Sequence, residues 1–429
     1  MASTAKVRPV SHASPSIGDL AARYRDVRGL TERLRGPLSA EDCQVQSMDD
    51  ASPTKWHLAH TSWFFETFVL APANPDYRPF HPDFAVLFNS YYQQVGPQHP
   101  RPRRGMLTRP TLDDVEAYRA HVDRHVLELL GRANGRNEPL SAIIELGLHH
   151  EQQHQELILT DAKHLLAANP LRPTYRAAAA GAPHAKTVAL RWLAHAGGVS
   201  EIGHKGRGFA FDNESPRHRT LLTPFALATR LVTNGEYLAF IEDAGYRNPA
   251  LWLSDGWSTL HALDWQAPLY WERRDGAWFE FTLAGLQPLA LDAPVCHVSF
   301  YEADAYATWT GARLPTEAEW EVSAAGARIE GNLLDSDRLH PVAARDGAGL
   351  QQLFGDVWEW TRSAYAPYPG YRAPNGALGE YNGKFMCNQQ VLRGGSCATP
   401  ASHIRATYRN FFPPNARWQF SGIRLAKDG

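Results

Sequence analysis

The sequence predicts a protein of two parts, an α-helical bundle followed by an α+β domain that is rich in loops. Four long segments in the first part place apolar residues at helical spacing. After a stretch rich in proline, alanine and glycine, short apolar runs are separated by glycine, asparagine and proline. The expected division is a disordered leader (1–15), a helical domain (16–170), a linker (171–187) and a second domain (188–429).

Composition excludes several classes of protein. The net charge is −2, from 43 basic and 45 acidic residues, and no polybasic run is present, so neither nucleic acid nor a membrane surface is expected as a partner. No apolar stretch reaches the roughly 18 residues of a spanning helix, and residues 1–15 lack the apolar core of a secretory signal. The four cysteines are too few for a disulfide framework, which predicts a reducing, cytoplasmic location.

The helices of the bundle are predicted from the spacing of apolar residues and from residue types typical of helix starts. The segments with apolar residues at helical spacing are 16–34, 52–70, 111–130 and 141–168. Ser52 before Pro53 predicts the N-cap and first residue of the second helix, and acidic residues lie in the first turn of the third. The connection between these two helices, 71–110, is long, and a long connection inside a compact domain is usually functional.

The second part is expected to contain two short helices, at 234–244 and 301–310. Four motifs in this part combine glycine, tryptophan and arginine, which suit tight turns and a packed core, so we interpret them as structural. These motifs lie at 313–321, 355–361, 393–396 and 422–424.

The strongest chemical signal is the pair His150 and His154, in the sequence HEQQH of the fourth helical segment. Histidines four apart lie on one helical face, so both imidazoles can reach one metal ion. Such a pair is more often part of a solvated surface, but apolar residues flank this cluster on both sides, and a polar cluster inside a bundle needs a partner. The same motif occurs in zinc hydrolases, where Glu151 would be the general base.

A third ligand is needed, and His57 and His60 in the second helical segment are both candidates. Three neutral imidazoles without a carboxylate would leave open positions on Fe(II), which suits oxygen and a bound substrate. Zinc also accepts three histidines, so the residues alone leave the metal open.

The long connection carries a second cluster, with tyrosines at 91 and 92 and the basic sequence HPRPRR at 99–104. Tyrosine hydroxyls can donate a proton or an electron, and arginine can clamp a carboxylate. Taken alone, the cluster is better interpreted as a surface loop with stacked tyrosines.

The ordered motifs of the second part resemble the formylglycine-generating-enzyme fold, a C-type-lectin-like domain. Enzymes that make formylglycine use a cysteine pair shortly after the RGGS turn, whereas here only Cys397 follows Ser396, so that chemistry is not expected. The first part resembles a DinB-like four-helix bundle. Together, over nearly the whole chain, the two parts resemble the non-heme iron sulfoxide synthases of ergothioneine biosynthesis and the similar selenoneine synthases.

This resemblance implies which residues form the site. The implied iron(II) ligands are His60, His150 and His154, with His57 as a neighbour. The residues implied to line the pocket for hercynine, which is trimethylated histidine, are Gln153, Asn410, Phe411 and Phe412. Amide dipoles and aromatic faces suit a fixed cation that has no N–H donors.

The family divides by its donor. Members that use γ-glutamylcysteine carry a basic pair, which Arg101 and Arg104 match, and an acid where Phe412 stands here. Members that use free cysteine carry a tyrosine pair, which Tyr91 and Tyr92 match, and the selenoneine enzymes accept a selenosugar. The donor is therefore expected to be a selenosugar or cysteine.

The resemblance implies an Fe(II)- and O₂-dependent enzyme that forms a C–S or C–Se bond at imidazole C2 of hercynine, giving a sulfoxide- or selenoxide-type product. Tyr91 or Tyr92 would supply a proton or an electron. Other tyrosines that could do so are Tyr365, Tyr368, Tyr371 and Tyr381. Two alternatives remain at this point: a zinc hydrolase with Glu151 as base, and a non-catalytic ligand-binding module.

Overall fold

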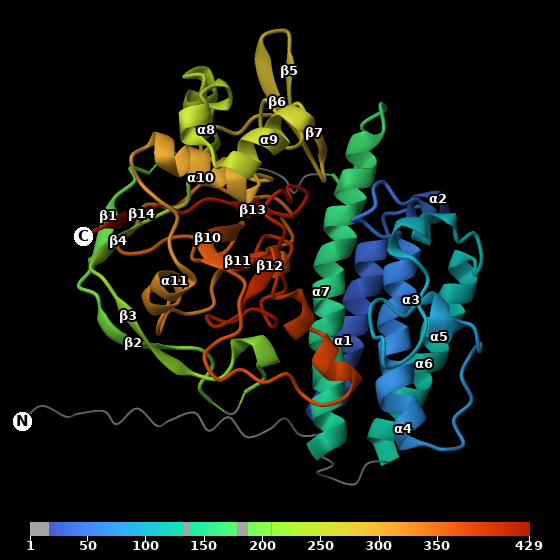
Figure 1. Ribbon diagram of the computed structural model, residues 1–429. Coiled ribbons are helices and arrows are strands. Elements are labelled where there is room, and N and C mark those ends of the chain that lie inside the picture. Colours follow the sequence, from blue (N-terminus) through green and yellow to red (C-terminus); the bar gives the residue numbers. More distant parts are fainter. Residues whose placement is uncertain (1–16, 133–137, 178–187, 207) are drawn as a thin grey trace, which may run out of the picture.

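The computed structural model describes residues 17–132, 138–177, 188–206 and 208–429, which form a helical part and a part built from small sheets (Figure 1). Helix α7 runs along the boundary between the two parts. The predicted leader, 1–15, and much of the predicted linker, 178–187, lie outside the described residues. Within the described ranges, no helix is long and apolar enough to cross a membrane.

Four long helices form the first part, as the spacing of apolar residues predicts. They are α1 (Ile17–Arg35), α3 (Thr54–Phe65), α6 (Leu112–Arg132) and α7 (Glu138–Ala168). The shorter helical segments are α2 (Ala40–Gln44), a π-helical turn (Glu66–Leu70), α4 (Ala71–Ala73) and α5 (Phe84–Leu87). Large apolar side chains such as Trp63, Phe64 and Phe65 fill the interior between the helices.

The predicted N-cap of the second helix is wrong. Helix α3 begins at Thr54, Pro53 occupies the N-cap position, and no side chain caps the helix. Ser52 instead donates its backbone N–H to Asp161 (2.8 Å), and its hydroxyl accepts a hydrogen bond from Arg104 (2.9 Å). These partners come from distant parts of the chain, so local sequence does not reveal them.

A buried ion-pair network joins three helices of the bundle. Glu151 on α7 is fully buried and accepts hydrogen bonds from Arg28 (2.8 Å) on α1 and Arg119 (3.1 Å) on α6. Thr31 donates a further hydrogen bond (2.7 Å). Burial alone would raise the pKa of Glu151, but the two arginines outweigh burial and lower it to about 2. Glu151 is therefore a charged structural anchor of the bundle core.

The long connection between α3 and α6 is ordered and reaches the second part. It contains α5 and a 3₁₀ helix (Arg101–Met106). The Asn89 side chain organises the tyrosine segment by donating to the carbonyl groups of Tyr92 (3.1 Å) and Gly96 (3.0 Å). The backbone N–H groups of residues 93 and 94 donate to Glu380 of the second part, both at 3.0 Å. The connection therefore ties the two parts together.

The second part contains five small sheets in the described residues. The four-stranded sheet has the order β12 (Asn410–Phe412), β11 (Gln390–Arg393), β10 (Trp358–Ala364) and β13 (Ser421–Gly422). A three-stranded sheet joins β1 (Trp192–His195), β4 (Phe225–Ala228) and β14 (Ala426–Asp428). A two-stranded sheet joins β2 (Gly198–Ile202) and β3 (His218–Leu222). A second three-stranded sheet has the order β5 (Trp271–Arg274), β6 (Ala277–Thr282) and β7 (Gly285–Pro288). A second two-stranded sheet joins β8 (Gly331–Asn332) and β9 (Phe354–Gly355).

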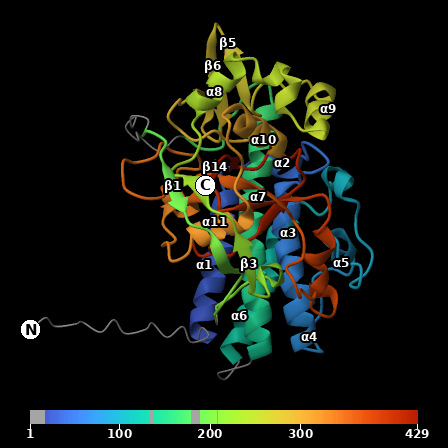
Figure 2. The ribbon, with the colours of Figure 1, turned by 60° about the vertical axis from the view of Figure 1, so that its left-hand side comes forward.

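Helices of the second part surround these sheets. They are α8 (Asn234–Glu242), α9 (Ser254–Ala262), α10 (Phe300–Trp309) and α11 (Glu317–Ser323). The two predicted helices correspond to α8 and α10, whereas α9 and α11 were not predicted. The strands β5 and β6, with α8 and α9, lie at the end of the molecule away from α4 in both views (Figures 1 and 2).

The arginine and tryptophan motifs of the second part form its buried framework. Arg424 pairs with Glu359 (2.7 Å), and the Trp320 indole N–H donates to the same carboxylate (2.7 Å). Arg393, which is fully buried, pairs with Glu321, which is nearly so. The structural interpretation of these motifs agrees with these contacts.

The first prediction concerns the buried network of the bundle. We expect Glu151→Gln to lower the free energy of unfolding by about 3–5 kcal/mol, because two buried arginines lose their countercharge. Urea denaturation followed by circular dichroism would measure this loss. The matched control is Glu145→Gln on the same helix, whose partly exposed pair with Arg23 should contribute about 0–1 kcal/mol. Equal stability of the two variants would contradict the anchor role.

Candidate metal centre and substrate cavity

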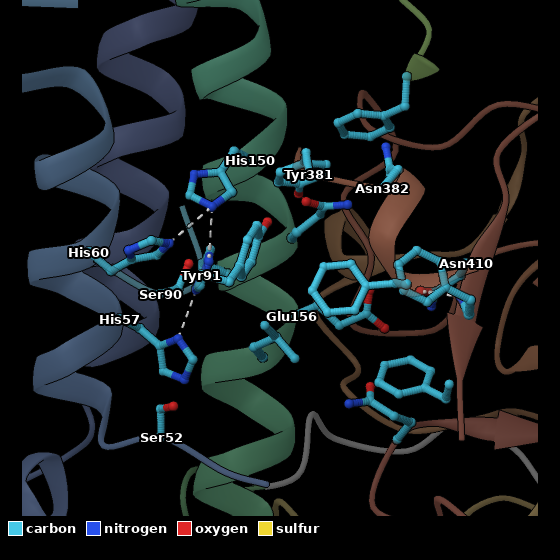
Figure 3. Close-up of a pocket in the computed structure, with 18 of the residues that line it drawn as sticks. Ser52, His57, His60, Ser90, Tyr91, His150, Glu156, Tyr381, Asn382 and Asn410 are labelled. Atoms are coloured by element: carbon cyan, nitrogen blue, oxygen red, sulfur yellow. Dashed lines mark hydrogen bonds between the residues drawn. The ribbon is translucent and has the colours of Figure 1, made fainter. Parts of the chain in front are cut away.

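Three histidine side chains from two helices converge at the edge of a cavity. His60 lies on α3, and His150 and His154 lie one turn apart on α7. The Nε2 atom of His150 is 3.2 Å from Nε2 of His60 and 3.2 Å from Nε2 of His154. Figure 3 shows the His60 and His150 rings turned toward each other. The ligand atoms of all three lie within 4.8 Å of one another, so the group could hold a metal ion.

Burial keeps these imidazoles neutral. Desolvation, and then the neighbouring histidines, lower the pKa values of His60 and His154 well below the ordinary value. Desolvation lowers the pKa of His150 to about 3. Neutral imidazole is the form that ligates a metal.

The hydrogen bonds around the histidines determine which ring nitrogens carry protons. His60 Nδ1 lies 2.6 Å from the Phe88 carbonyl oxygen, which only accepts, so His60 Nδ1 donates and Nε2 keeps its lone pair. His57 Nε2 lies 3.0 Å from an Asp161 carboxylate oxygen and must likewise donate. His57 Nδ1 then accepts from His154 Nδ1 at 2.8 Å, which leaves the His154 Nε2 lone pair free.

The Nε2 lone pairs of His60 and His154 therefore point to one place, and Nε2 of His150 lies 3.2 Å from each of them. A cation bound there would be held by the three Nε2 atoms, with the His150 proton on Nδ1. The fit with a metal ion follows from the donor set itself. His57 lies behind His154, between it and Asp161, and orients that ring. Of the two candidates for a third ligand in α3, the structure brings His60 to the group and keeps His57 out of it.

The geometry argues against a zinc hydrolase that uses Glu151 as its base. Both carboxylate oxygens of Glu151 are bound to side chains of the bundle core, and Glu151 does not line the cavity. Its lowered pKa makes it a poor proton acceptor. The glutamate of the HEQQH motif is thus a structural residue of the bundle core, whereas the hydrolase interpretation requires it to be a catalytic base.

A cavity of about 440 Å³ opens beside the histidines, between the bundle and the second part. The predicted site residues that line it are His60, Tyr91, Arg101, Arg104, His150, Gln153, His154, Asn410, Phe411 and Phe412. Further lining residues that the sequence did not single out include Trp56, Phe211, Trp358, Asn382, Phe385, Tyr408, Arg409 and Gln419. No local pattern distinguishes these from core residues.

The two candidate tyrosines face different surroundings. Tyr91 lines the cavity, and its ring lies 4.7 Å from that of Tyr92. Tyr92 is fully buried and does not line the cavity. The centroid of its ring lies 5.6 Å from that of Trp63 and 5.2 Å from that of Phe68. Of the two tyrosines predicted as candidates, the structure therefore gives only Tyr91 a side chain that can contact a molecule bound in the cavity.

Tyr381 of the second part joins Tyr91 at the metal centre. Its ring lies 5.8 Å from that of His150 and 6.1 Å from that of Tyr91. Of the four other tyrosines considered from the sequence, only Tyr381 lines the cavity. Burial raises the pKa values of Tyr91 and Tyr381 well above the ordinary value, so both phenols keep their protons at neutral pH.

The opposite wall combines amides with aromatic rings. The Gln153 amide donates to the Tyr408 hydroxyl (2.7 Å), which also lies 3.1 Å from His403 Nε2. Asn410 begins strand β12 and points into the cavity region (Figure 3). Phe411 follows it and stacks on Tyr365, with 4.0 Å between ring centroids. Neighbouring side chains therefore hold Gln153 and Phe411 in place.

A buried cation lies at another side of the cavity. Arg104 is 5% exposed, donates to the Ser52 hydroxyl (2.9 Å) and lies 3.4 Å from the centroid of the Trp56 ring. Desolvation, and then the nearby Arg101, lower its pKa. Among the described residues no carboxylate forms an ion pair with Arg104, which indicates that this side of the cavity suits an anionic group.

Comparisons with known proteins cover both parts of the chain. The DinB superfamily matches residues 23–158, and the Sulfatase-modifying factor enzyme 1-like domain matches residues 191–429. These matches confirm the predicted fold class, a DinB-like bundle followed by a formylglycine-generating-enzyme-like domain.

Two relatives match this chain over most of its length, and a third matches part of it. The hercynine oxygenase of Mycolicibacterium thermoresistibile is 32% identical, over 97% of this chain and 96% of that protein. The hercynine oxygenase of Mycolicibacterium smegmatis is 34% identical, over 88% of this chain and 91% of that protein. The formylglycine-generating enzyme of Streptomyces coelicolor is 29% identical, over 60% of this chain and 95% of that enzyme.

The second prediction tests the metal centre. We expect His154→Ala to lose bound metal, because the pair of ligands one turn apart on α7 is broken. His57→Ala should still bind metal, with affinity about tenfold to hundredfold lower, since it removes only the group that orients His154. Metal content after equilibrium dialysis would measure both. Full occupancy of His154→Ala at low metal concentration would exclude it as a ligand.

Proposed function

The chain belongs to the hercynine oxygenase family, and we propose that it joins a sulfur or selenium donor to imidazole C2 of hercynine in a reaction that depends on iron(II) and O₂. The observation that carries this proposal is the convergence of three imidazole nitrogen atoms at the wall of a cavity. Iron(II) held by His60, His150 and His154 would supply open coordination positions for oxygen activation. The product would be of sulfoxide or selenoxide type.

We assign hercynine to the wall formed by Gln153, Asn410, Phe411 and Phe412. The trimethylammonium group of hercynine has no N–H to donate, so amide dipoles and aromatic faces are suitable neighbours. Tyr408 supports this assignment because its hydroxyl accepts from the Gln153 amide and so fixes the direction of that side chain. Side chains held in place in this way lower the entropy lost when the substrate is oriented.

We propose that the donor is a selenosugar or cysteine and that it binds on the side of Arg104 and Arg101. Arg104 is a buried cation without an acidic partner in the described chain, so it favours a donor that brings a thiolate, a selenolate or a carboxylate. Phe412 lines the cavity and gives the amino group of γ-glutamylcysteine no countercharge there. The dipeptide should therefore be the weakest of the three donors.

We propose that Tyr91 supplies the proton or electron that directs the reaction to bond formation at hercynine. Its phenol lines the cavity and stays protonated because burial raises its pKa. The Tyr381 ring lies close to both His150 and Tyr91 and can assist in this role. Proton donation by a positioned side chain contributes about 10²–10⁴-fold to the rate of a typical step.

The third prediction tests the reaction and its donor. Purified iron(II)-loaded protein is incubated under air with hercynine and with cysteine, γ-glutamylcysteine or a selenosugar, and products are analysed by mass spectrometry. We expect a hercynine conjugate with cysteine or the selenosugar, little with γ-glutamylcysteine, and none under nitrogen. If no donor gives an oxygen-dependent conjugate, or if zinc supports the reaction equally well, the proposed function is wrong.

The fourth prediction separates the two neighbouring tyrosines. We expect Tyr91→Phe to reduce coupled product per O₂ consumed by about tenfold or more, with the donor oxidised instead, because a cavity phenol is lost. Tyr92→Phe is the matched control and should couple like the wild type, since its ring lies outside the cavity. Oxygen-electrode and product measurements give the ratio. Normal coupling in Tyr91→Phe would assign the role to another residue.

A further inference from the structure

A chain of hydrogen bonds runs from the cavity wall into the second part and back to α7. The Gln153 amide nitrogen lies 2.7 Å from the Tyr408 hydroxyl oxygen, which lies 3.1 Å from His403 Nε2. His403 Nδ1 in turn lies 3.0 Å from Nδ1 of His149 on α7. Tyr408, His403 and His149 are all buried, so water does not compete for these groups.

The protons of these groups give the chain one direction. Burial raises the pKa of Tyr408, so its hydroxyl keeps the proton. The hydroxyl oxygen accepts from Gln153, and the other partner of this hydroxyl among the described residues is His403 Nε2, which therefore receives the proton. Desolvation, and then Arg405, lower the pKa of His403. The His403 ring is thus neutral, with its single proton on Nδ1 and directed at His149.

This direction decides which end of the Gln153 amide faces the cavity. Because Tyr408 gives its proton to His403, its oxygen can only accept from Gln153, and Gln153 must present its N–H group to Tyr408. The Gln153 side chain lines the cavity, and no group of the described residues donates to its carbonyl oxygen, which is left for a bound molecule. In the reverse direction the amide N–H groups would face the cavity and would repel a cation.

We propose that His403 is a positioning residue for hercynine: by accepting the Tyr408 proton, it holds the negative end of the Gln153 amide dipole toward the trimethylammonium group. The inference rests on the proposed function and adds to it a residue that does not itself line the cavity. His403 acts through two other side chains, so its effect should depend on the charge of the ligand. A side chain that is held in place before binding also loses less entropy when the substrate binds.

The experiment measures binding without turnover. Iron(II)-loaded protein under nitrogen is titrated calorimetrically with hercynine and with 3-(imidazol-4-yl)propionate, which has the same imidazole and carboxylate but no ammonium group. In His403→Leu, which offers no acceptor for the Tyr408 proton, we expect the affinity for hercynine to fall about threefold to tenfold, the effect of one hydrogen bond. The affinity for the propionate should stay unchanged. His403→Gln, whose amide oxygen can accept the proton, should restore most of the affinity for hercynine.

A double-mutant cycle tests whether His403 acts through Tyr408. Tyr408→Phe removes the hydroxyl that links His403 to Gln153, so we expect a loss of hercynine affinity similar to that of His403→Leu. Adding His403→Leu to Tyr408→Phe should then cause no further loss. A residue with a merely structural role would instead weaken binding by the same factor in both backgrounds.

Ser402→Ala is the matched control. The Ser402 hydroxyl accepts a hydrogen bond (2.7 Å) from Gln152, which precedes Gln153 on α7 but does not line the cavity. The variant removes a contact of the same kind between the same two segments, and it should bind both ligands like the wild type. A loss of hercynine affinity as large as that of His403→Leu would show that the contact between the segments matters, not the direction of the amide, and would overturn the proposal.

The proposal stays falsifiable even if His403→Leu does not fold. Unchanged or increased affinity of Tyr408→Phe for hercynine overturns it, and so does an equal loss for hercynine and the propionate, because the direction of the amide would then not matter. Both results leave hercynine as a ligand. Failure of the wild type to bind hercynine at all instead contradicts the proposed function.

Discussion

Each polar side chain that α7 carries into the interior needs a partner, and this requirement organises the rest of the structure. Along residues 150–156 of this helix, His150 and His154 face the cavity, Glu151 faces the arginines of α1 and α6, and Glu156 faces the second part. Burial makes each unpaired group costly by about 1–3 kcal/mol or more. The helix can therefore take only the position in which all of these partners are present at once.

Both parts of the chain contribute residues that line the cavity. The bundle supplies the histidines, the long connection supplies Tyr91 and Arg104, and the second part supplies Tyr381 and the wall that starts at Asn410. The connection is held to the second part by Glu380, which accepts two backbone N–H groups. Fixing a loop by its backbone leaves its side chains free to face the cavity, which explains why a long connection can serve as a wall.

Sequence reasoning succeeds here where periodicity carries the information. Apolar spacing predicts the four long helices, and the spacing of His150 and His154 predicts one metal-binding face. It fails where contacts with residues far away in the sequence decide which way a side chain points. Tyr91 and Tyr92 are neighbours in sequence, yet the aromatic residues around Tyr92 hold its ring in the bundle. His57 and His60 share a helix, yet His57 donates to Asp161, whereas His60 donates to the Phe88 carbonyl and turns its other nitrogen to His150.

A buried arginine without an ion-pair partner at the wall of the cavity bears on which ligands the site can select. Arg104 is buried, donates to the Ser52 hydroxyl and lies over the Trp56 ring, and among the described residues no carboxylate forms an ion pair with it. A ligand that brings the missing charge restores the electrostatic balance, whereas a neutral isostere of the same shape leaves a buried charge unpaired. Selectivity of this kind comes from the penalty imposed on the wrong ligand as much as from attraction to the right one.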